Sequence, residues 1–373
     1  MDFDSLLKLM VQKGGSDLFI TAGVPPSMKV NGKILPVSKT PLTSELARDI
    51  VLSIMTDTQR KEFQTHHECN FAIARPQIGR FRVSAYNQRN QSAMVLRRIE
   101  TTIPNMDDLR LPSTLKDLAM TKRGLIIFVG GTGTGKSTSL ASMIGFRNKN
   151  SRGHIITIED PIEFIHQHEG CIITQREVGI DTESFEVALK NTLRQAPDVI
   201  LIGEIRTPDV MDKAIAFAET GHLCLATLHA NNANQALDRI IHFFPVERHD
   251  QLWMDLSLNM RAIVAQQLIP TPDGKGRRAA IEILINTPLV ADLIRKGDIH
   301  LIKELMTKSR ELGMQTFDQA LFDLYDAGEI TYEDAIAHAD SANDLRLMIK
   351  LGHETDATSL DAATRGLRLE DTE

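Results

Sequence analysis

A glycine-rich segment carries the clearest chemistry in this 373-residue sequence. Residues 130–137 read GGTGTGKS, which fits the pattern GxxxxGK[S/T]. Glycines let backbone N–H groups converge on phosphate oxygens where a Cβ would intrude, and a following helix adds favourable partial charge. In this pattern the lysine, here Lys136, contacts the β- and γ-phosphates, and the hydroxyl of Ser137 binds Mg²⁺. The segment therefore predicts a nucleotide-binding site.

The flanking residues support this interpretation. An apolar run at residues 125–129 precedes the segment and a helix-compatible stretch, residues 137–146, follows it. A guanine-reading loop of the form NKxD is absent, because residues 148–151 read NKNS and follow the first helix too closely. ATP with Mg²⁺ is therefore the expected ligand. The predicted cofactor-binding residues are Gly130, Gly131, Thr132, Gly133, Thr134, Gly135, Lys136, Ser137 and Thr138.

Carboxylates follow two further apolar runs. Residues 155–158 lead into EDPIE at 159–163, and residues 199–202 lead into Gly203 and Glu204. Ligands of open α/β sheets lie beyond the carboxyl ends of strands. A strand in this second position usually ends in an aspartate that helps to hold Mg²⁺. Because Gly203 stands there, Glu204 is predicted to serve instead, through water.

Two histidines, His222 and His229, flank the apolar run 223–228. Side chains seven residues apart on a regular strand point to opposite faces, so a shared metal site is not expected. Their place one strand after Glu204 favours contact with the γ-phosphate instead.

The first hundred residues predict a small α+β unit. Helices are expected at 3–11 and 43–55, and antiparallel strands at 17–21, 28–30, 33–37, 70–74, 80–86 and 93–99. The turn Asn31-Gly32 is a strong hairpin signal. After residue 114, apolar runs alternate with helical segments, which predicts a buried parallel sheet wrapped by helices. These strands are expected at 125–129, 155–158, 199–202, 223–228 and 262–268.

The domain organisation follows from these shifts in pattern. We expect an N-terminal α+β domain (1–100), a linker containing two prolines (101–114), an α/β nucleotide-binding domain (115–286) and a C-terminal helical subdomain (287–340). An acidic flexible tail, residues 341–373, is expected to follow.

Composition excludes some classes of protein. Lys and Arg number 42 against 49 Asp and Glu, a net charge of −7 that disfavours a generally basic nucleic-acid-binding surface. The three cysteines are widely spaced and favour a reducing cytosol. The acidic start MDFD lacks a signal-peptide pattern, and no apolar run approaches about 18 residues. We therefore expect a cytoplasmic protein that contacts membranes only through partners.

Four strings now carry a family resemblance: GGTGTGKST, TIEDPIEF, DVILIGEIR and AETGHLCLATLHANNA. They resemble the Walker A, Asp box, Walker B and His box of secretion-superfamily ATPases, and within them the type IV pilus retraction ATPases of the PilT type. The resemblance covers about residues 1–340. It implies a RecA-like P-loop core, a PAS-like N-terminal domain and a homohexamer, peripheral at the cytoplasmic face of the inner membrane. Such a ring would hydrolyse ATP to retract pili in twitching motility.

The resemblance also implies roles for single residues. Glu163 matches the acid that activates the attacking water, and Glu204 the Walker B acid. His222 and His229 match the two His-box histidines. The arginines that the N-terminal domain offers to a neighbour's nucleotide are matched by Arg82 and Arg97, which would neutralise charge on the transferred phosphoryl group.

Departures from the family pattern leave alternatives open. The tetracysteine motif of assembly-type relatives is missing, which disfavours a pilus-assembly or type II secretion ATPase. Residues 290–297, VADLIRKG, keep only part of the C-terminal stretch of PilT, and the tail is extended, which favours a paralogue of PilT. The chain is therefore either an independent motor or an accessory subunit that depends on a PilT-like retraction ATPase. An inner-membrane pilus platform protein is the other expected partner, and a nucleic-acid translocase is the least favoured alternative.

Overall fold

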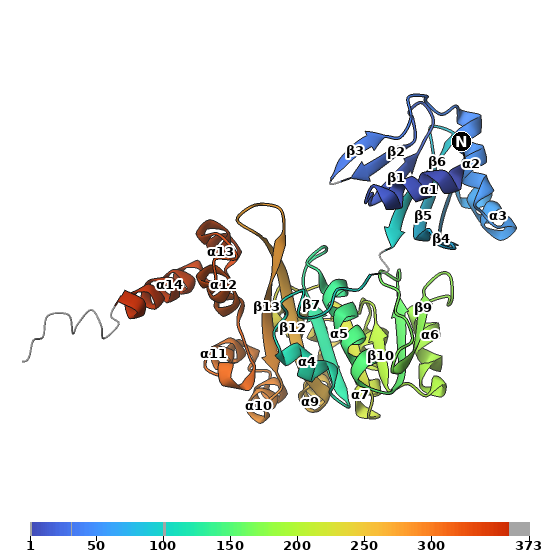
Figure 1. Cartoon of the computed structure of the whole chain (residues 1–373). Coiled ribbons are helices and arrows are strands. Elements are labelled where there is room, and N and C mark those ends of the chain that lie inside the picture. The colour runs from blue at the N-terminus through green and yellow to red at the C-terminus, as the bar shows by residue number, and fades with distance from the viewer. Residues whose placement is uncertain (1, 31, 100–101, 358–373) are drawn as a thin grey trace, which may run out of the picture. The chain divides into compact units, whose positions relative to one another are not determined.

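The computed structural model describes residues 2–30, 32–99 and 102–357. The chain forms two compact units. The first contains the chain up to Ile103 together with Glu159–Gln167 and Gln175–Ala188. The second contains Pro104–Ile158, His168–Thr174 and the chain from Leu189 onward. Each unit is described separately below (Figure 1).

The first unit is built on a six-stranded sheet in the order β3-β2-β1-β6-β5-β4, antiparallel throughout. Its strands are β1 (Asp17–Ile20), β2 (Ser27–Val30), β3 (Lys33–Pro36), β4 (Glu68–Arg75), β5 (Gly79–Gln88) and β6 (Gln91–Ile99). Along β5, Phe81 and Val83 are buried whereas Arg82 is exposed, so one face meets a core and the other meets solvent. The predicted hairpin pairing of β2 with β3 is confirmed, while Asn31 lies outside the described residues.

Three helices supply the apolar side chains that complete this core: α1 (Phe3–Gln12), α2 (Ser44–Ser53) and α3 (Asp57–His66). Each begins at a polar cap, because the side chains of Asp2, Thr43 and Thr56 accept hydrogen bonds from first-turn N–H groups. The sequence did not predict α3, whose sole buried residue is Phe63. Its capping box, rather than an apolar stripe, marks where it begins.

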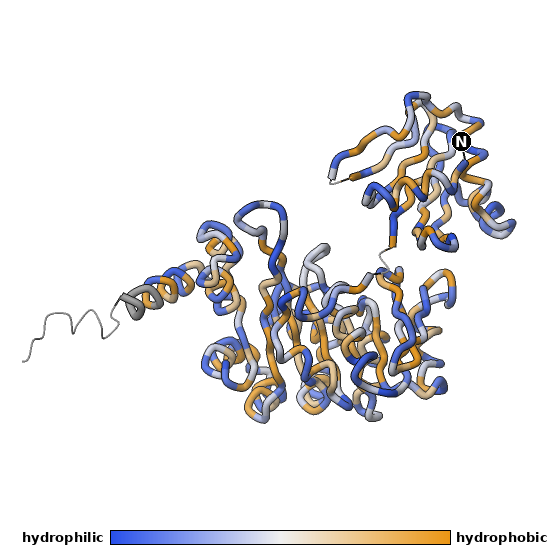
Figure 2. Tube along the Cα trace, viewed as in Figure 1, coloured by the Kyte–Doolittle hydropathy of each residue, from blue (hydrophilic) through white to orange (hydrophobic). Residues whose placement is uncertain are grey.

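The second unit contains a seven-stranded sheet in the order β13-β12-β7-β11-β10-β8-β9. The strands are β7 (Gly124–Val129), β8 (Gly153–Glu159), β9 (Cys171–Glu177), β10 (Val199–Ile202), β11 (Leu223–Leu228), β12 (Met260–Pro270) and β13 (Arg277–Ile285). The stretch from β12 to β8 is parallel, as predicted. The edge strand β13 instead runs antiparallel to β12, and neither β13 nor β9 was predicted. The strands are mainly hydrophobic, whereas the loop joining β12 and β13 is hydrophilic (Figure 2).

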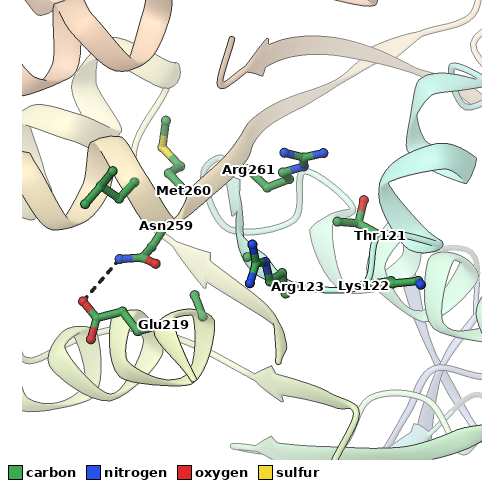
Figure 3. Close-up of a pocket in the computed structure, with 10 residues that line it drawn as sticks. Thr121, Lys122, Arg123, Glu219, Asn259, Met260 and Arg261 are labelled. Carbon is green, nitrogen blue, oxygen red and sulfur yellow. Dashed lines mark hydrogen bonds between the residues drawn. The ribbon is translucent and has the colours of Figure 1, made fainter. Parts of the chain in front are cut away.

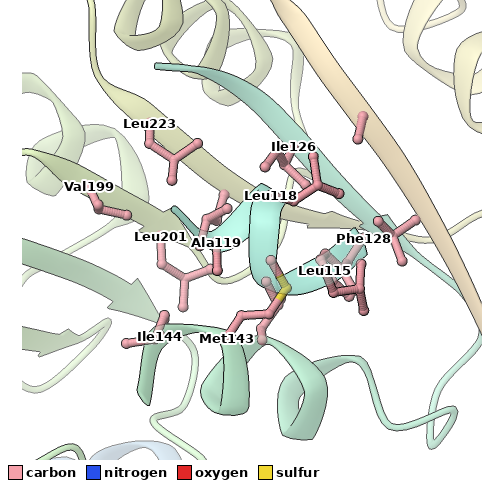
Figure 4. Packing of buried hydrophobic residues seen from close by; sticks show 14 of the residues in the cluster. Leu115, Leu118, Ala119, Ile126, Phe128, Met143, Ile144, Val199, Leu201 and Leu223 are labelled. Carbon is pink, nitrogen blue, oxygen red and sulfur yellow. The ribbon is translucent and has the colours of Figure 1, made fainter. Parts of the chain in front are cut away.

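Helices cover this sheet: α4 (Thr114–Ala119), α5 (Lys136–Asn150), α6 (Phe185–Thr192), α7 (Pro208–Glu219), α8 (Ala233–Ile241) and α9 (His249–Asn259). Every residue of β7, β10 and β11 is buried, as expected for strands that are covered on both faces. On one face, Leu115 and Leu118 of α4 and Met143 of α5 pack against Ile126 and Leu201 of the strands (Figure 4). This core fixes the strand ends from which the candidate site residues emerge.

The C-terminal region is helical, as predicted, with α10 (Pro288–Lys296), α11 (Ile302–Thr307), α12 (Phe317–Asp326), α13 (Tyr332–His338) and α14 (Ala342–Ala357). The prediction of a flexible tail from residue 341 is wrong for its first part. Residues 342–357 form α14, and Leu345 and Ile349 are buried. Their spacing of four residues places both on one helix face, a pattern that the acidic composition obscured. The rest of the predicted tail, residues 358–373, lies outside the described residues.

The predicted linker, residues 101–114, is also corrected. Contacts place Pro104–Ile158, and with it most of the predicted linker, in the second unit. Met106 and Leu111 are buried in the core of that unit, and Thr114 already begins α4. The two prolines predict an irregular connection. They do not show that the apolar residues between them, Met106 and Leu111, are buried in the core of the second unit. Residues 100–101 lie outside the described part of the chain.

Candidate nucleotide site

The glycine-rich segment, called the P-loop from here on (residues 130–137), joins the end of β7 to the start of α5. Gly130 and Gly135 have φ values of +152° and +86°, in which other residues are strained. A Cβ on Gly130 would lie 2.7 Å from the carbonyl oxygen of Gln266, and one on Gly135 would lie 2.8 Å from the Gln266 side-chain nitrogen. These glycines are therefore required both by conformation and by space.

Gln266, on β12, holds the P-loop from beneath. Its Nε2 donates to the carbonyl of Thr134 at 2.9 Å, and its Oε1 accepts from the hydroxyl of Ser139 at 2.8 Å. The side chain is buried, so these bonds do not compete with water. Sequence reasoning missed this residue, although a polar residue inside an apolar strand is a signal that could have found it. The Lys136 ammonium donates to the carbonyls of Gly130 and Gly131, both at 2.8 Å.

Glu204 and His229 lie together at the same edge of the sheet. The Nε2 atom of His229 is 3.0 Å from Oε1 of Glu204, and the Arg206 guanidinium donates to Oε2 of Glu204 at 2.7–2.8 Å. The segment after β10 is anchored between its neighbours, because the Gly203 N–H donates to the Ile158 carbonyl at 2.8 Å. Glu204 is only 19% exposed, so its charge acts in a partly desolvated setting. Arg206 was not predicted as part of the site.

A cavity of about 310 Å³ lies beside these groups. It is lined by P-loop residues, by the segment after β11 and by one face of α8: Gly130, Gly131, His229, Ala230, Asn231, Gln235 and Arg239. Asn232 caps α8 by accepting from the Gln235 N–H at 2.9 Å. The residues that α8 contributes had no sequence motif to reveal them, because an amphipathic helix shows only which face is apolar.

His222 lies elsewhere, and its predicted contact with the γ-phosphate is wrong for the site of its own chain. Strands β7 and β11 are parallel with Gly124 opposite Leu223 and Val129 opposite Leu228. His229 therefore follows β11 at the P-loop edge, while His222 precedes it at the other edge, about 20 Å away along the strand. The Nδ1 atom of His222 lies 3.0 Å from the Thr220 hydroxyl.

A larger cavity of about 580 Å³ occupies this opposite edge (Figure 3). Lys122, Arg123 and Arg261 line it, and Asn259 donates to Glu219 at 3.2 Å across it. Within the described part of the chain, the side chains of Lys122, Arg123 and Arg261 form no ion pair. Because no P-loop residue lines it, the larger cavity is separate from the P-loop.

Glu163 is exposed, on a loop that the contacts group with the first unit. The loop is anchored by two side chains of β9. The Gln175 amide accepts from the His166 N–H at 2.8 Å and donates to the Phe164 carbonyl at 2.8 Å. The buried Glu177 accepts from the Ile162 N–H at 3.2 Å, and burial raises the pKa of Glu177. Glu163 is therefore an exposed carboxylate on an anchored backbone.

Arg82 and Arg97 are direct cross-strand neighbours on β5 and β6. Both are exposed, and Nε of Arg97 donates to the buried Asp17 at 2.8 Å. Two like charges opposite each other destabilise a sheet unless something offsets them. Asp17 offsets the charge of Arg97, and the buried Glu177 interacts favourably with the charge of Arg82. Arg80, on the same strand as Arg82, pairs with Glu177 at 3.5 Å.

The residues present fit Mg²⁺. Ser137, in the first turn of α5, and Glu204 offer the hard oxygen donors that this ion prefers, at the edge where phosphates would lie. Mg²⁺ keeps several waters and is usually held by one or two protein groups together with substrate phosphates. The described residues contain no group of three or more His, Cys, Asp or Glu that could hold a metal without such help.

A parallel sheet with a P-loop at its carboxyl edge, a carboxylate after another strand of the same edge and a cavity lined by P-loop residues define the class of P-loop nucleotide-binding proteins. The family model described as "Type II/IV secretion system protein" matches residues 4–311. The chain belongs to this family.

Within this family, the chain is similar to several curated relatives and solved structures. The chain is 73% identical to "Type IV pilus ATPase PilU" of Pseudomonas aeruginosa, over all of this chain and 98% of that protein. It is 38% identical to the PilT retraction ATPase of the same organism, over 90% of this chain and 97% of that protein. The crystal structure of the pilus retraction motor PilT with bound ADP superimposes with a TM-score of 0.87 at 37% identity, covering 93% of this chain and 99% of that one. No helix among the described residues is long and apolar enough to cross a membrane.

Proposed function

We propose that this chain binds and hydrolyses ATP at the carboxyl edge of its large sheet. One arrangement carries the proposal: the P-loop and the Glu204–His229 pair follow neighbouring parallel strands and meet at one cavity. The bound ADP in the PilT structure, a relative at 37% identity, supports nucleotide use at such a site.

Each residue of the site has a role that fits its chemistry. The backbone N–H groups of the P-loop and the Lys136 ammonium bind the β- and γ-phosphates. Ser137 and Glu204 would hold Mg²⁺, Glu204 through water, and the ion when bound neutralises phosphate charge. His229, held by Glu204, faces the cavity where the γ-phosphate would lie. Glu163 orients the attacking water, which agrees with an exposed carboxylate on an anchored loop.

The exposed arginine pair of the N-terminal domain completes the site from a neighbouring copy. Arg82 and Arg97 stand side by side on the solvent face of the antiparallel sheet. A guanidinium reaching an adjoining subunit's γ-phosphate would stabilise charge in the transition state. This requires a ring of subunits, and we propose a homohexamer.

The biological role follows from the relatives. We propose that the ring powers type IV pilus retraction and twitching motility at the cytoplasmic face of the inner membrane, beside a PilT-like motor and a pilus platform protein. The higher identity to PilU than to PilT, 73% against 38%, favours a co-motor that adds to a main motor. An accessory subunit whose own hydrolysis is dispensable is the second candidate.

ATP turnover of the purified full-length chain, measured together with its oligomeric mass, tests the proposal. We expect turnover by a hexamer, and a monomer without turnover contradicts the motor. Rings mixed from Lys136→Ala and Arg97→Ala subunits test the action between copies. Some interfaces would regain both parts, so a complete absence of recovered activity contradicts it.

The two biological candidates separate in cells. Lys136→Ala in a strain that keeps its PilT-like motor should reduce retraction force or the fraction of retracting pili. Unchanged twitching and retraction would instead contradict the co-motor and favour the accessory subunit.

A further inference from the structure

Glu282 is a buried charge that the proposed mechanism does not use. It lies on β13 with only 2% of its surface exposed. Its Oε1 accepts from the backbone N–H of Ala233 at 2.8 Å, and it also accepts from the N–H of Phe317. Ala233 is the first residue of α8 and Phe317 is the first residue of α12. One carboxylate therefore binds the N-termini of two helices.

First-turn N–H groups have no partner within their own helix. At α8 the Asn232 side chain satisfies the N–H of Gln235 and leaves that of Ala233 to Glu282. Because the site is buried, water cannot take over this role, and losing the acceptor would leave an unsatisfied donor. The N-terminus of α8 is therefore held from below by Glu282.

The position of α8 matters because its N-terminus continues into the wall of the nucleotide cavity. His229, Ala230 and Asn231 line the cavity immediately before this helix, and Gln235 and Arg239 line it from the helix itself. A shift of α8 would move His229 relative to Glu204, whose atoms now lie 3.0 Å apart. Sub-ångström misplacement of a catalytic group is enough to slow a reaction severalfold.

Charged groups from the C-terminal helices surround Glu282. Lys303 of α11 lies 2.8 Å from Asp340 and 4.0 Å from Asp318 of α12. Burial raises the pKa of Glu282 to about 7, and Asp340 adds to this; the Ala233 and Phe317 N–H groups and Lys303 oppose it. Glu282 therefore changes charge near neutral pH.

We propose that Glu282 is a positioning residue for ATP hydrolysis, holding α8 and, through it, residues 229–231 in the geometry that turnover requires. The inference rests on the proposed ATPase function. Because Glu282 also binds α12, it joins the C-terminal helices to the wall of the nucleotide cavity. The P-loop does not depend on it, since Gln266 and Lys136 hold that segment separately.

Three variants of the full chain test the proposal. Glu282→Leu removes the acceptor at similar volume and should lower kcat about tenfold while changing ADP affinity less than twofold. Glu282→Gln keeps a carbonyl oxygen that can accept from the Ala233 N–H, and at pH 6 should recover most of the turnover. Glu329→Leu is the matched control: it removes a carboxylate that pairs with Arg110 and with Arg278 of β13, and should leave kcat within twofold.

The outcomes separate this inference from the proposed function. An inactive wild type contradicts the function itself. An active wild type with Glu282→Leu turnover within twofold contradicts the positioning role. Equal losses of kcat and ADP affinity in Glu282→Leu, matched by Glu329→Leu, would show general destabilisation and also contradict it.

A pH series keeps the test decisive if Glu282→Leu fails to fold. Below pH 6 the wild-type carboxyl is mostly neutral and resembles glutamine. Above pH 8 it is mostly ionised and binds the two N–H groups more strongly. The ratio of wild-type to Glu282→Gln kcat should therefore rise from near one at pH 6 to about threefold or more at pH 8. A ratio that stays constant across this range contradicts the proposal.

Discussion

The two edges of the large sheet carry similar residues and have different chemistry. At the carboxyl edge, the P-loop, Glu204 and His229 follow parallel strands, and a cavity of about 310 Å³ is lined by Gly130, Gly131 and His229. At the amino edge, a cavity of about 580 Å³ is lined by Lys122, Arg123 and Glu219. Lysine, arginine, glutamate and histidine occur at both.

The difference lies in what the backbone offers. At the carboxyl edge the chain passes into a glycine loop and the N-terminus of α5, whose first-turn N–H groups can bind an anion. No such loop lines the amino-edge cavity, where the cations project from a connecting segment and from the start of β12. Residue types alone therefore do not define the site, and their position along the strands does.

The largest expected effect is the loss of the P-loop lysine. Lys136→Ala should lower ATP turnover by about 100-fold or more, because it removes the charge that we propose binds the transferred phosphoryl group. Lys122→Ala is the matched control at the amino edge and should leave turnover within twofold. Steady-state phosphate release measures both. Comparable losses of turnover in the two variants would contradict the claim that only the carboxyl edge carries the nucleotide site.

Glu204→Gln should follow, with turnover reduced on the order of 30- to 100-fold. The substitution keeps the shape but removes the charge that holds Arg206 and His229. The matched change at the amino edge is Glu219→Gln, which retains an acceptor for Asn259 and should leave turnover unchanged. A mild effect of Glu204→Gln would mean that another carboxylate serves the ion.

Gln266→Leu should weaken ATP binding about tenfold, because the carbonyl of Thr134 and the hydroxyl of Ser139 lose their buried partner. Fluorescent nucleotide titration measures the affinity. Gln267→Leu, one position along the same strand, is the control and should bind ATP normally. Normal binding by Gln266→Leu would show that the P-loop holds its shape unaided.

The smallest effect is expected at the amino-edge cavity. The double variant Arg123→Ala and Arg261→Ala should keep ATP affinity and kcat within twofold, because neither guanidinium has a contact with the P-loop. Nucleotide titration and turnover of the purified variant provide the check. A clear loss of activity would extend the functional site to this edge.

Strands were the most predictable part of the fold. The bounds of β10 and β11 agree with the sequence because both are continuous apolar runs buried on both faces. In contrast, α3 has a single buried residue and β13 begins with two arginines, so neither carries a clear apolar period. The first part of the expected tail folds as α14 because two buried residues suffice to pack it.

The candidate site was predictable where a motif fixes geometry. The P-loop needs its glycines for conformation, and the structure places them after β7 as expected. Gln266 and Glu282 were missed because the sequence does not show which groups a polar residue in a mainly apolar strand contacts. His222 was misassigned because residue spacing indicates the face of a strand, whereas the contact depends on which end of the strand the residue occupies.

The two histidines around β11 provide the most direct test, since they share a strand and a residue type. ATP turnover of His229→Ala and His222→Ala, measured side by side in purified full-length protein, isolates position as the variable. We expect His229→Ala to lose about tenfold or more in kcat. His222→Ala should stay within twofold, with a lower Tm from its lost bonds to Thr220 and Phe217. Equal losses in kcat, or a larger loss for His222→Ala, would contradict a site confined to the carboxyl edge.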